Sequence, residues 1–254
     1  MKWIYRIGLA VSALTVALGV TPAAASAADV NIEANYYWNA DGYTGTLDVY
    51  SVASDGAVQA TLSDNGQIEQ LSGTWTASAG RLDITRPLAG GVVQFYSYWL
   101  GGKPYNSDPI MLAGYYTANV AGYGDRGAYL DSVWPANPAS QASHTASANN
   151  FTIETSYFWN ADGETGTFDI FSLDANGNVV GTLDHNGMLE NLTGVWNPSD
   201  GVLFLNRSIA GGQVQNYVYF LGGGMYNSNQ AEFGGYYNVN GSQPVRGSYL
   251  DSAR

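Results

Sequence analysis

The stretch Trp38-Asn-Ala-Asp-Gly-Tyr-Thr-Gly-Thr-Leu-Asp48 occurs a second time, almost unchanged, as Trp159-Asn-Ala-Asp-Gly-Glu-Thr-Gly-Thr-Phe-Asp169. The offset of 121 residues between the two copies holds without a gap from about residue 30 to residue 119. It slips by one residue only before Arg126 and Arg246. An internal repeat of this length predicts two copies of one domain in tandem.

The N-terminal segment has the features of a secretory signal peptide. Lys2 and Arg6 precede an almost wholly apolar run over residues 7–20, and residues 25–27 are small, as a signal peptidase requires. The run is too short to cross a bilayer comfortably, and no later stretch is long or apolar enough. We therefore expect residues 1–27 to be removed, leaving a secreted protein, extracellular or periplasmic, without membrane insertion of the mature chain.

Charge and cysteine content narrow the classes of partner. The full chain has a formal net charge of −12, and loss of Lys2 and Arg6 leaves −14. Such an acidic protein lacks the Lys and Arg clusters that bind phosphate backbones, so we predict no nucleic-acid partner. The chain has no cysteine, so each domain must be stabilised by its own hydrophobic core rather than by disulfides.

Short strands separated by regular turn signals dominate both copies. Asp-Gly, Asn-Gly and Gly-Gly pairs recur at short, regular intervals between segments rich in β-branched and aromatic residues. No segment shows a helical period. We predict an all-β protein with an antiparallel up-and-down barrel of eight strands at 28–132, a Pro/Ala/Ser-rich linker at 133–150 and a second such barrel at 151–254. A two-layer sandwich is the alternative for each copy, and a single sixteen-stranded barrel is disfavoured by the linker.

A row of amide and phenol groups recurs on one side of a strand in each copy. In residues 93–99 and 214–220, a glutamine and two tyrosines alternate with positions that differ between the copies. Such a row suits a pocket for a sugar or another polar small molecule. A filled barrel interior with ordered water would show the same pattern. The residues are Gln94, Tyr96 and Tyr98 in the first copy and Gln215, Tyr217 and Tyr219 in the second.

Both copies also carry an aspartate in the middle of a predicted strand. Asp48 and Asp169 are flanked by apolar residues, so each needs a partner, and we expect Arg86 and Arg207 to supply it. The pair is either a buried ion pair that fixes strand register or an orienting charge at the floor of a ligand cavity. Similarly, Trp38 and Trp159 are either core residues or binding platforms.

Metal and catalytic motifs receive little support. Asp41 and Asp162 precede glycine, where aspartate commonly makes a turn, and the surrounding residues do not complete a calcium loop. His144 and His185 are the only histidines, so a triad or zinc cluster cannot form within one copy. One carboxylate pair, Asp48 with Glu69, has the chemistry of a glycosidase, but the domain is small for a catalytic cleft. We predict no metal, no cofactor and no enzyme activity.

One hairpin in each copy begins with a Gly-x-Trp pattern, Gly73-Thr-Trp75 and Gly194-Val-Trp196, followed by a turn and an apolar strand. These hairpins resemble the opening hairpin of avidin and streptavidin, and the same pattern is found in lipocalins. The resemblance covers a dozen residues per copy and implies a calycin-like barrel. The positions that would bond biotin hold Ala77 and Arg81 in the first copy and Pro198 and Val202 in the second, so biotin is not implied.

Together these patterns favour a secreted tandem-repeat binding protein that recognises glycan or another polar small molecule in each barrel. Two tethered sites would bind a repetitive target more tightly than either site alone. The alternatives are a structural module that contacts a surface protein, and a barrel of the protease-inhibitor type without a small-molecule ligand. The predicted site residues are Trp38, Asp48, Arg86, Gln94, Tyr96 and Tyr98, with Trp159, Asp169, Arg207, Gln215, Tyr217 and Tyr219.

Overall fold

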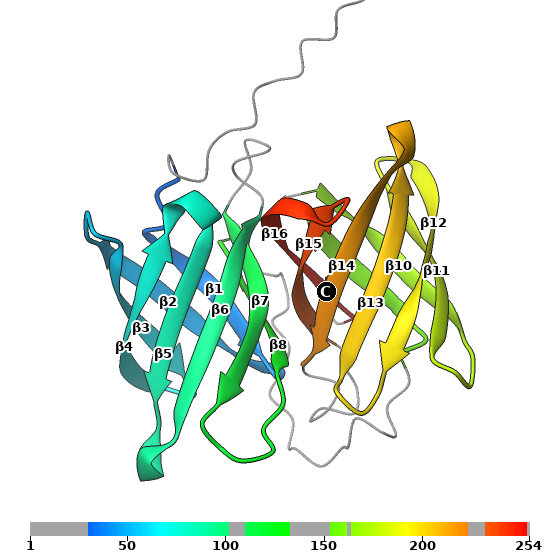
Figure 1. Ribbon diagram of the computed structural model, residues 1–254. Coiled ribbons are helices and arrows are strands. Elements are labelled where there is room, and N and C mark those ends of the chain that lie inside the picture. Colours follow the sequence, from blue (N-terminus) through cyan, green and yellow to red (C-terminus); the bar gives the residue numbers. More distant parts are fainter. Residues whose placement is uncertain (1–29, 102–109, 133–152, 162–163, 223–231, 253–254) are drawn as a thin grey trace, which may run out of the picture.

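Each copy of the repeat forms its own closed barrel of eight antiparallel strands in the computed structural model (Figure 1). The structure describes residues 30–101, 110–132, 153–161, 164–222 and 232–252. Barrel 1 consists of β1 (Ala34–Ala40), β2 (Tyr43–Val52), β3 (Ala57–Asp64), β4 (Gln67–Thr76), β5 (Arg81–Pro87), β6 (Val93–Gly101), β7 (Met111–Ala118) and β8 (Arg126–Asp131). Barrel 2 consists of β9 (Ser156–Ala161), β10 (Glu164–Leu173), β11 (Asn178–His185), β12 (Met188–Asn197), β13 (Val202–Ile209), β14 (Gln213–Leu221), β15 (Glu232–Val239) and β16 (Ser242–Asp251).

This topology confirms the predicted fold class and rules out the sandwich and the single sixteen-stranded barrel. In barrel 1 each strand pairs with its neighbour in sequence, and β1 closes the sheet by pairing with β8, with Trp38 opposite Leu130. In barrel 2 the equivalent closure places Trp159 opposite Leu250. Closure leaves neither sheet with an unpaired edge. The predicted signal peptide and linker lie outside the described residues.

Alternation along the strands fills both barrel interiors. Leu47 and Val49 of β2 are buried, whereas Asp48 between them is only partly covered. The same alternation in β3 buries Val58, Ala60 and Leu62. A period of two is what a sheet with one face toward a core and the other toward water produces. The interior is therefore apolar along most of its length.

The connections between strands divide barrel 1 into two different ends. One end carries the β1–β2, β3–β4, β5–β6 and β7–β8 connections, and the other carries the β2–β3 and β4–β5 connections. The chain that enters β1 packs at the second end, where the Tyr36 hydroxyl donates to the Ile32 carbonyl over 2.8 Å and Ile32 is buried. We call the first end the mouth of the barrel.

The two barrels pack against each other through β6–β8 of barrel 1 and β14–β16 of barrel 2 (Figure 1). Tyr129 and Tyr249 stack at the centre, with ring centroids 4.1 Å apart and planes within 5°. The Tyr129 hydroxyl donates to Asp251 over 2.6 Å, and the Tyr249 hydroxyl donates to Asp131 over 2.8 Å. The tyrosines are matched positions of the repeat, and so are the aspartates, so the contact has the reciprocal form of a twofold dimer interface.

Aromatic and glycine contacts extend the same reciprocity. Trp99 packs on Tyr236 and Tyr115 packs on Phe220, both with ring centroids 4.7 Å apart. Glycine at position 127 allows the backbones to meet, since a Cβ there would collide with the Phe220 carbonyl and the Gly234 amide. The repeats are thus joined by an extensive interface as well as by the chain between them, which the expectation of two separate domains on a linker did not include.

Replacing Gly127 with alanine tests the close contact. Because the added methyl group meets backbone atoms of the other barrel, it has to separate the two sheets, and we expect the free energy of unfolding to fall by about 1–3 kcal/mol. The matched control is Gly124→Ala, where a Cβ meets no atom within 4 Å. Chemical denaturation of both variants checks this, and equal stability of the two would contradict the packing.

Candidate functional site

The mouth of barrel 1 opens into a cavity of about 530 Å³. This volume falls within the range of ordinary small-molecule sites. Strands from around the barrel and three of the four connections at the mouth contribute to its wall. The lining residues are Trp38, Ala40, Asp41, Tyr43, Asp64, Arg86, Leu88, Gln94, Tyr96, Tyr116, Tyr123 and Arg126.

Asp41 is positioned by the hairpin turn between β1 and β2. It adopts a φ of 55°, and Gly42 follows with a φ of 75°, the left-handed pair that a two-residue hairpin of this kind requires. Pairing of β1 with β8 places Ala40 opposite Ala128, which brings the turn to the start of β8. There Arg126 donates to Asp41 Oδ2 over 3.0 Å, and the Tyr116 hydroxyl donates to the same oxygen.

The carboxylate of Asp41 is deeply buried and one of its oxygens is unused. The residue is 3% exposed, and Oδ1 has no hydrogen-bond partner among the described residues. Burial raises the pKa of Asp41 to about 7, against the opposing effects of the Arg126 charge and the Tyr116 hydrogen bond. An unsatisfied buried acceptor costs free energy, so a ligand that donates a hydrogen bond to it would be favoured.

Tyrosine rings form one wall and the floor of the cavity. Tyr98 stacks beneath Tyr96 with ring centroids 5.8 Å apart, and Tyr96 stacks on Tyr116 at 4.8 Å. The Tyr116 and Tyr123 hydroxyls lie 3.0 Å apart, and the guanidinium of Arg126 lies 4.3 Å from the centre of the Tyr123 ring. The Tyr96 hydroxyl donates to Gln94 over 2.8 Å. The site therefore combines ring faces with hydrogen-bonding groups at their edges.

Arg86 is a second charged residue that lines the cavity and is held by hydrogen bonds. Its Nε and Nη2 atoms donate to the two oxygens of Glu69 over 2.6 and 2.9 Å, and Nη2 lies 3.4 Å from Asp64. This hydrogen bonding from Arg86 lowers the pKa of Glu69. The guanidinium also lies 5.5 Å from the Trp38 ring centre. Arg86 is therefore fixed in place before any ligand arrives.

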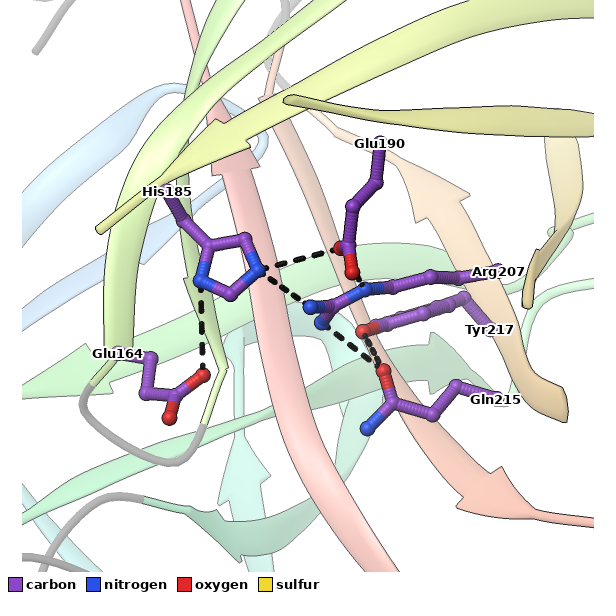
Figure 2. A network of polar contacts seen from close by, with 6 residues as sticks. All are labelled: Glu164, His185, Glu190, Arg207, Gln215 and Tyr217. Carbon is purple, nitrogen blue, oxygen red and sulfur yellow. Dashed lines mark hydrogen bonds and ion pairs between the residues drawn. The ribbon is translucent and has the colours of Figure 1, made fainter. Parts of the chain in front are cut away.

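Barrel 2 assembles a related but different network at the matched place (Figure 2). Arg207 donates to Glu190 and, over 3.0 Å, to Gln215, which also accepts from the Tyr217 hydroxyl over 2.8 Å. His185 stands where barrel 1 has Asp64. Its Nε2 contacts Arg207 and lies 3.2 Å from Glu190.

His185 makes the two mouths unequal. The imidazole is 4% exposed, and its ring centre lies 5.7 Å from that of Trp159. It is larger than the Asp64 carboxylate and lies in the middle of the polar network that Figure 2 shows. The Arg–Glu and Tyr–Gln bonds occur in both barrels, and barrel 2 adds the contacts of His185 and the bond from Arg207 to Gln215. Asp162, the counterpart of Asp41, lies outside the described residues.

Most of the predicted site residues come together, but the mid-strand aspartates do not. Trp38, Arg86, Gln94 and Tyr96 line the cavity, and Tyr98 lies beneath Tyr96. In barrel 2, Arg207, Gln215 and Tyr217 share one hydrogen-bond network. The guanidinium of Arg207 lies 5.8 Å from the centre of the Trp159 ring. The Tyr219 ring stacks on that of Tyr217.

The expected pairing of Asp48 with Arg86 is wrong, because Arg86 binds Glu69 and Asp64. Asp48 alternates with the buried Leu47 and Val49, so it belongs to the outer face of the barrel. Asp169 likewise belongs to the outer face of barrel 2, where it accepts a hydrogen bond from Ser156. Its predicted partner, Arg207, binds Glu190 instead. Neither aspartate forms the floor of a cavity.

Several residues of the site were missed in the sequence. Asp41 was interpreted as a turn residue, and Glu69 as half of a carboxylate pair. Tyr116 and Arg126 recur at matched positions as Tyr237 and Arg246. This recurrence was the feature of the sequence that could have identified them as site residues. Their role depends on closure of the barrel, which joins residues 85 positions apart.

No protein-family model matches this sequence, and no curated protein matches it significantly. The inference of function therefore depends on the geometry of the site. Across the described residues, no helix is long and apolar enough to cross a membrane. In the same part of the chain, no cluster of three His, Cys, Asp or Glu side chains is placed to hold a metal ion.

The raised pKa of Asp41 predicts a specific pH dependence of stability. Between its ordinary value of 3.8 and about 7, the unfolded chain releases the Asp41 proton while the folded chain keeps it. Each rise in pH within this window therefore favours unfolding, by a total of about 4 kcal/mol. We expect the stability of the wild-type protein relative to Asp41→Asn to fall from pH 4 to pH 7 and to level off above.

Chemical denaturation of the two proteins at four or five pH values measures this difference. Subtracting the variant removes the contribution of the other carboxyl groups. A constant difference across the window would show that Asp41 is not buried as described.

Proposed function

We propose that this protein is exported and binds a neutral saccharide in the cavity of barrel 1. The observation that carries the proposal is the buried Asp41 carboxylate, whose Oδ1 has no partner among the described residues and which lines an accessible cavity. A sugar hydroxyl is a suitable donor for that oxygen.

The other lining groups support the same class of ligand. Arg86 and Gln94 offer hydrogen bonds at fixed positions, and the rings of Trp38 and Tyr96 offer flat apolar faces. Sugars combine hydroxyl groups with apolar C–H faces, so they can use both kinds of surface. The cavity holds cationic and anionic side chains together, which favours a neutral ligand over a strongly charged one. Export is supported by the signal-like residues 1–27.

We assign one such site to each chain, in barrel 1. In barrel 2, His185 replaces Asp64 and takes part in the network around Arg207 (Figure 2). Barrel 2 instead contributes to the stability of the pair through the reciprocal tyrosine interface.

Isothermal titration against a panel of methyl glycosides and N-acetylhexosamines tests the proposal. We expect heat of binding from at least one neutral sugar, with a stoichiometry near one per chain. Because the sugar needs the ionised form of Asp41, the apparent Kd should weaken by about tenfold between pH 8 and pH 6. Heat from none of the sugars would refute the saccharide proposal, and a stoichiometry of two would refute the single site.

A matched pair of substitutions locates the site. Asp64→His places the barrel 2 residue beside Arg86 in the cavity, and we expect it to weaken sugar binding by about tenfold or more through lost space. His185→Asp is the corresponding change in barrel 2 and should leave the affinity of the barrel 1 site within about twofold. Equal effects of the two changes would exclude the mouth of barrel 1 as the binding site.

A further inference from the structure

A glutamate of barrel 2 reaches the turn that holds the key carboxylate of barrel 1. Glu232, the first residue of β15, is 2% exposed. Its Oε2 atom accepts a hydrogen bond from the backbone N–H of Gly42 over 3.3 Å. The bond crosses the interface between the barrels, and it joins residues 190 positions apart in the sequence.

Gly42 immediately follows Asp41, so this bond acts on the geometry of the site. Both residues of the turn adopt positive φ values, 55° and 75°. A small rotation of such a tight turn moves the side chain of its first residue. The Asp41 carboxylate would then shift relative to Arg126 and Tyr116, with which it now bonds. Fixing the Gly42 amide therefore helps to hold the Asp41 carboxylate at the cavity.

The sequence provides no matching carboxylate acceptor in barrel 1. Barrel 1 carries Met111 where barrel 2 carries Glu232, and a thioether is a weak acceptor at best. The tyrosine–aspartate contacts of the same interface are reciprocal. The repeats thus differ at the interface, where barrel 2 has Glu232, as well as at the mouth, where barrel 1 has Asp64. A buried carboxylate is costly, so an apolar residue such as methionine would be the simpler choice there.

We propose that Glu232 is a positioning residue through which barrel 2 supports the binding site of barrel 1. The inference depends on the proposed function, since it assigns barrel 2 a part in the same site. The two repeats then have different roles: barrel 1 holds the ligand, and barrel 2 holds the turn that presents Asp41. Ligand affinity becomes sensitive to the packing between the barrels.

Two substitutions at Glu232 in the full chain test the proposal with two readouts. Glu232→Met introduces the barrel 1 residue and removes the acceptor, whereas Glu232→Gln keeps a carbonyl oxygen. We expect the methionine variant to exchange the Gly42 amide hydrogen about tenfold faster and to bind the methyl glycosides of the panel roughly five- to tenfold more weakly. The glutamine variant should stay within about twofold of wild type in both.

Tyr249→Phe separates this effect from general weakening of the interface. It removes the hydroxyl that bonds Asp131 without touching Gly42, so we expect it to lower the melting temperature while leaving Gly42 exchange and glycoside affinity near wild type. Unchanged Gly42 exchange in Glu232→Met would overturn the proposal, and so would faster exchange with unchanged affinity. If the wild-type protein binds no glycoside, the proposed function fails, and the Gly42 exchange rates still decide whether Glu232 holds the turn.

Discussion

Closure of β1 onto β8 is the constraint on which the site depends. The pairing of Ala40 with Ala128 brings the β1–β2 turn to the first residues of β8, so a carboxylate and a guanidinium far apart in the sequence come within 3.0 Å. An open sheet would leave Asp41 exposed on an edge turn, with an ordinary pKa. In the closed barrel the same aspartate is buried against Tyr116 and Arg126, and it becomes part of a cavity.

The duplication has produced a pair of barrels with a symmetric contact and unequal mouths. The stacked tyrosines and their aspartate partners exchange the same bonds in both directions, as two identical subunits would. The mouths differ at several positions, among them Asp64 against His185 and Tyr43 against Glu164. A symmetric interface needs both copies to keep the same residues, whereas a binding site needs only one copy to keep an accessible cavity. The two repeats can therefore differ in role while remaining alike in fold.

The fold could be predicted from the sequence because its determinants are local. Turn pairs such as Asp-Gly and Asn-Gly, and a period of two between them, fix the strands, and the internal repeat fixes the number of barrels. The side of each strand that faces inward was harder to assign. Asp48 lies between the apolar Leu47 and Val49, and those neighbours, not the aspartate, face the interior. The row of Gln94, Tyr96 and Tyr98 could be recognised because it recurs in the second copy, whereas the positions between its members, Phe95 and Ser97, change to Asn216 and Val218.

The remaining site residues could not be predicted because their roles arise from long-range contacts. The turn of Asp41 is readable in the sequence, but its burial follows from barrel closure. Glu232 acts across the contact between the barrels, and its sequence neighbours give no sign of a partner in the first repeat. The difference that His185 makes is recognised only by comparison with Asp64, the residue at the matched position of barrel 1. Each of these depends on knowing which segments meet in space.

Chemical-shift mapping by NMR tests the central claim most directly. In an amide spectrum of the full chain titrated with the sugar that binds best, the account predicts shifts concentrated at the β1–β2 turn, the β6 residues around Gln94 and the start of β8. The amide signals of the matched residues of barrel 2 should keep their chemical shifts. Equal shifts in both barrels, or shifts confined to outer faces away from the mouth, would contradict it.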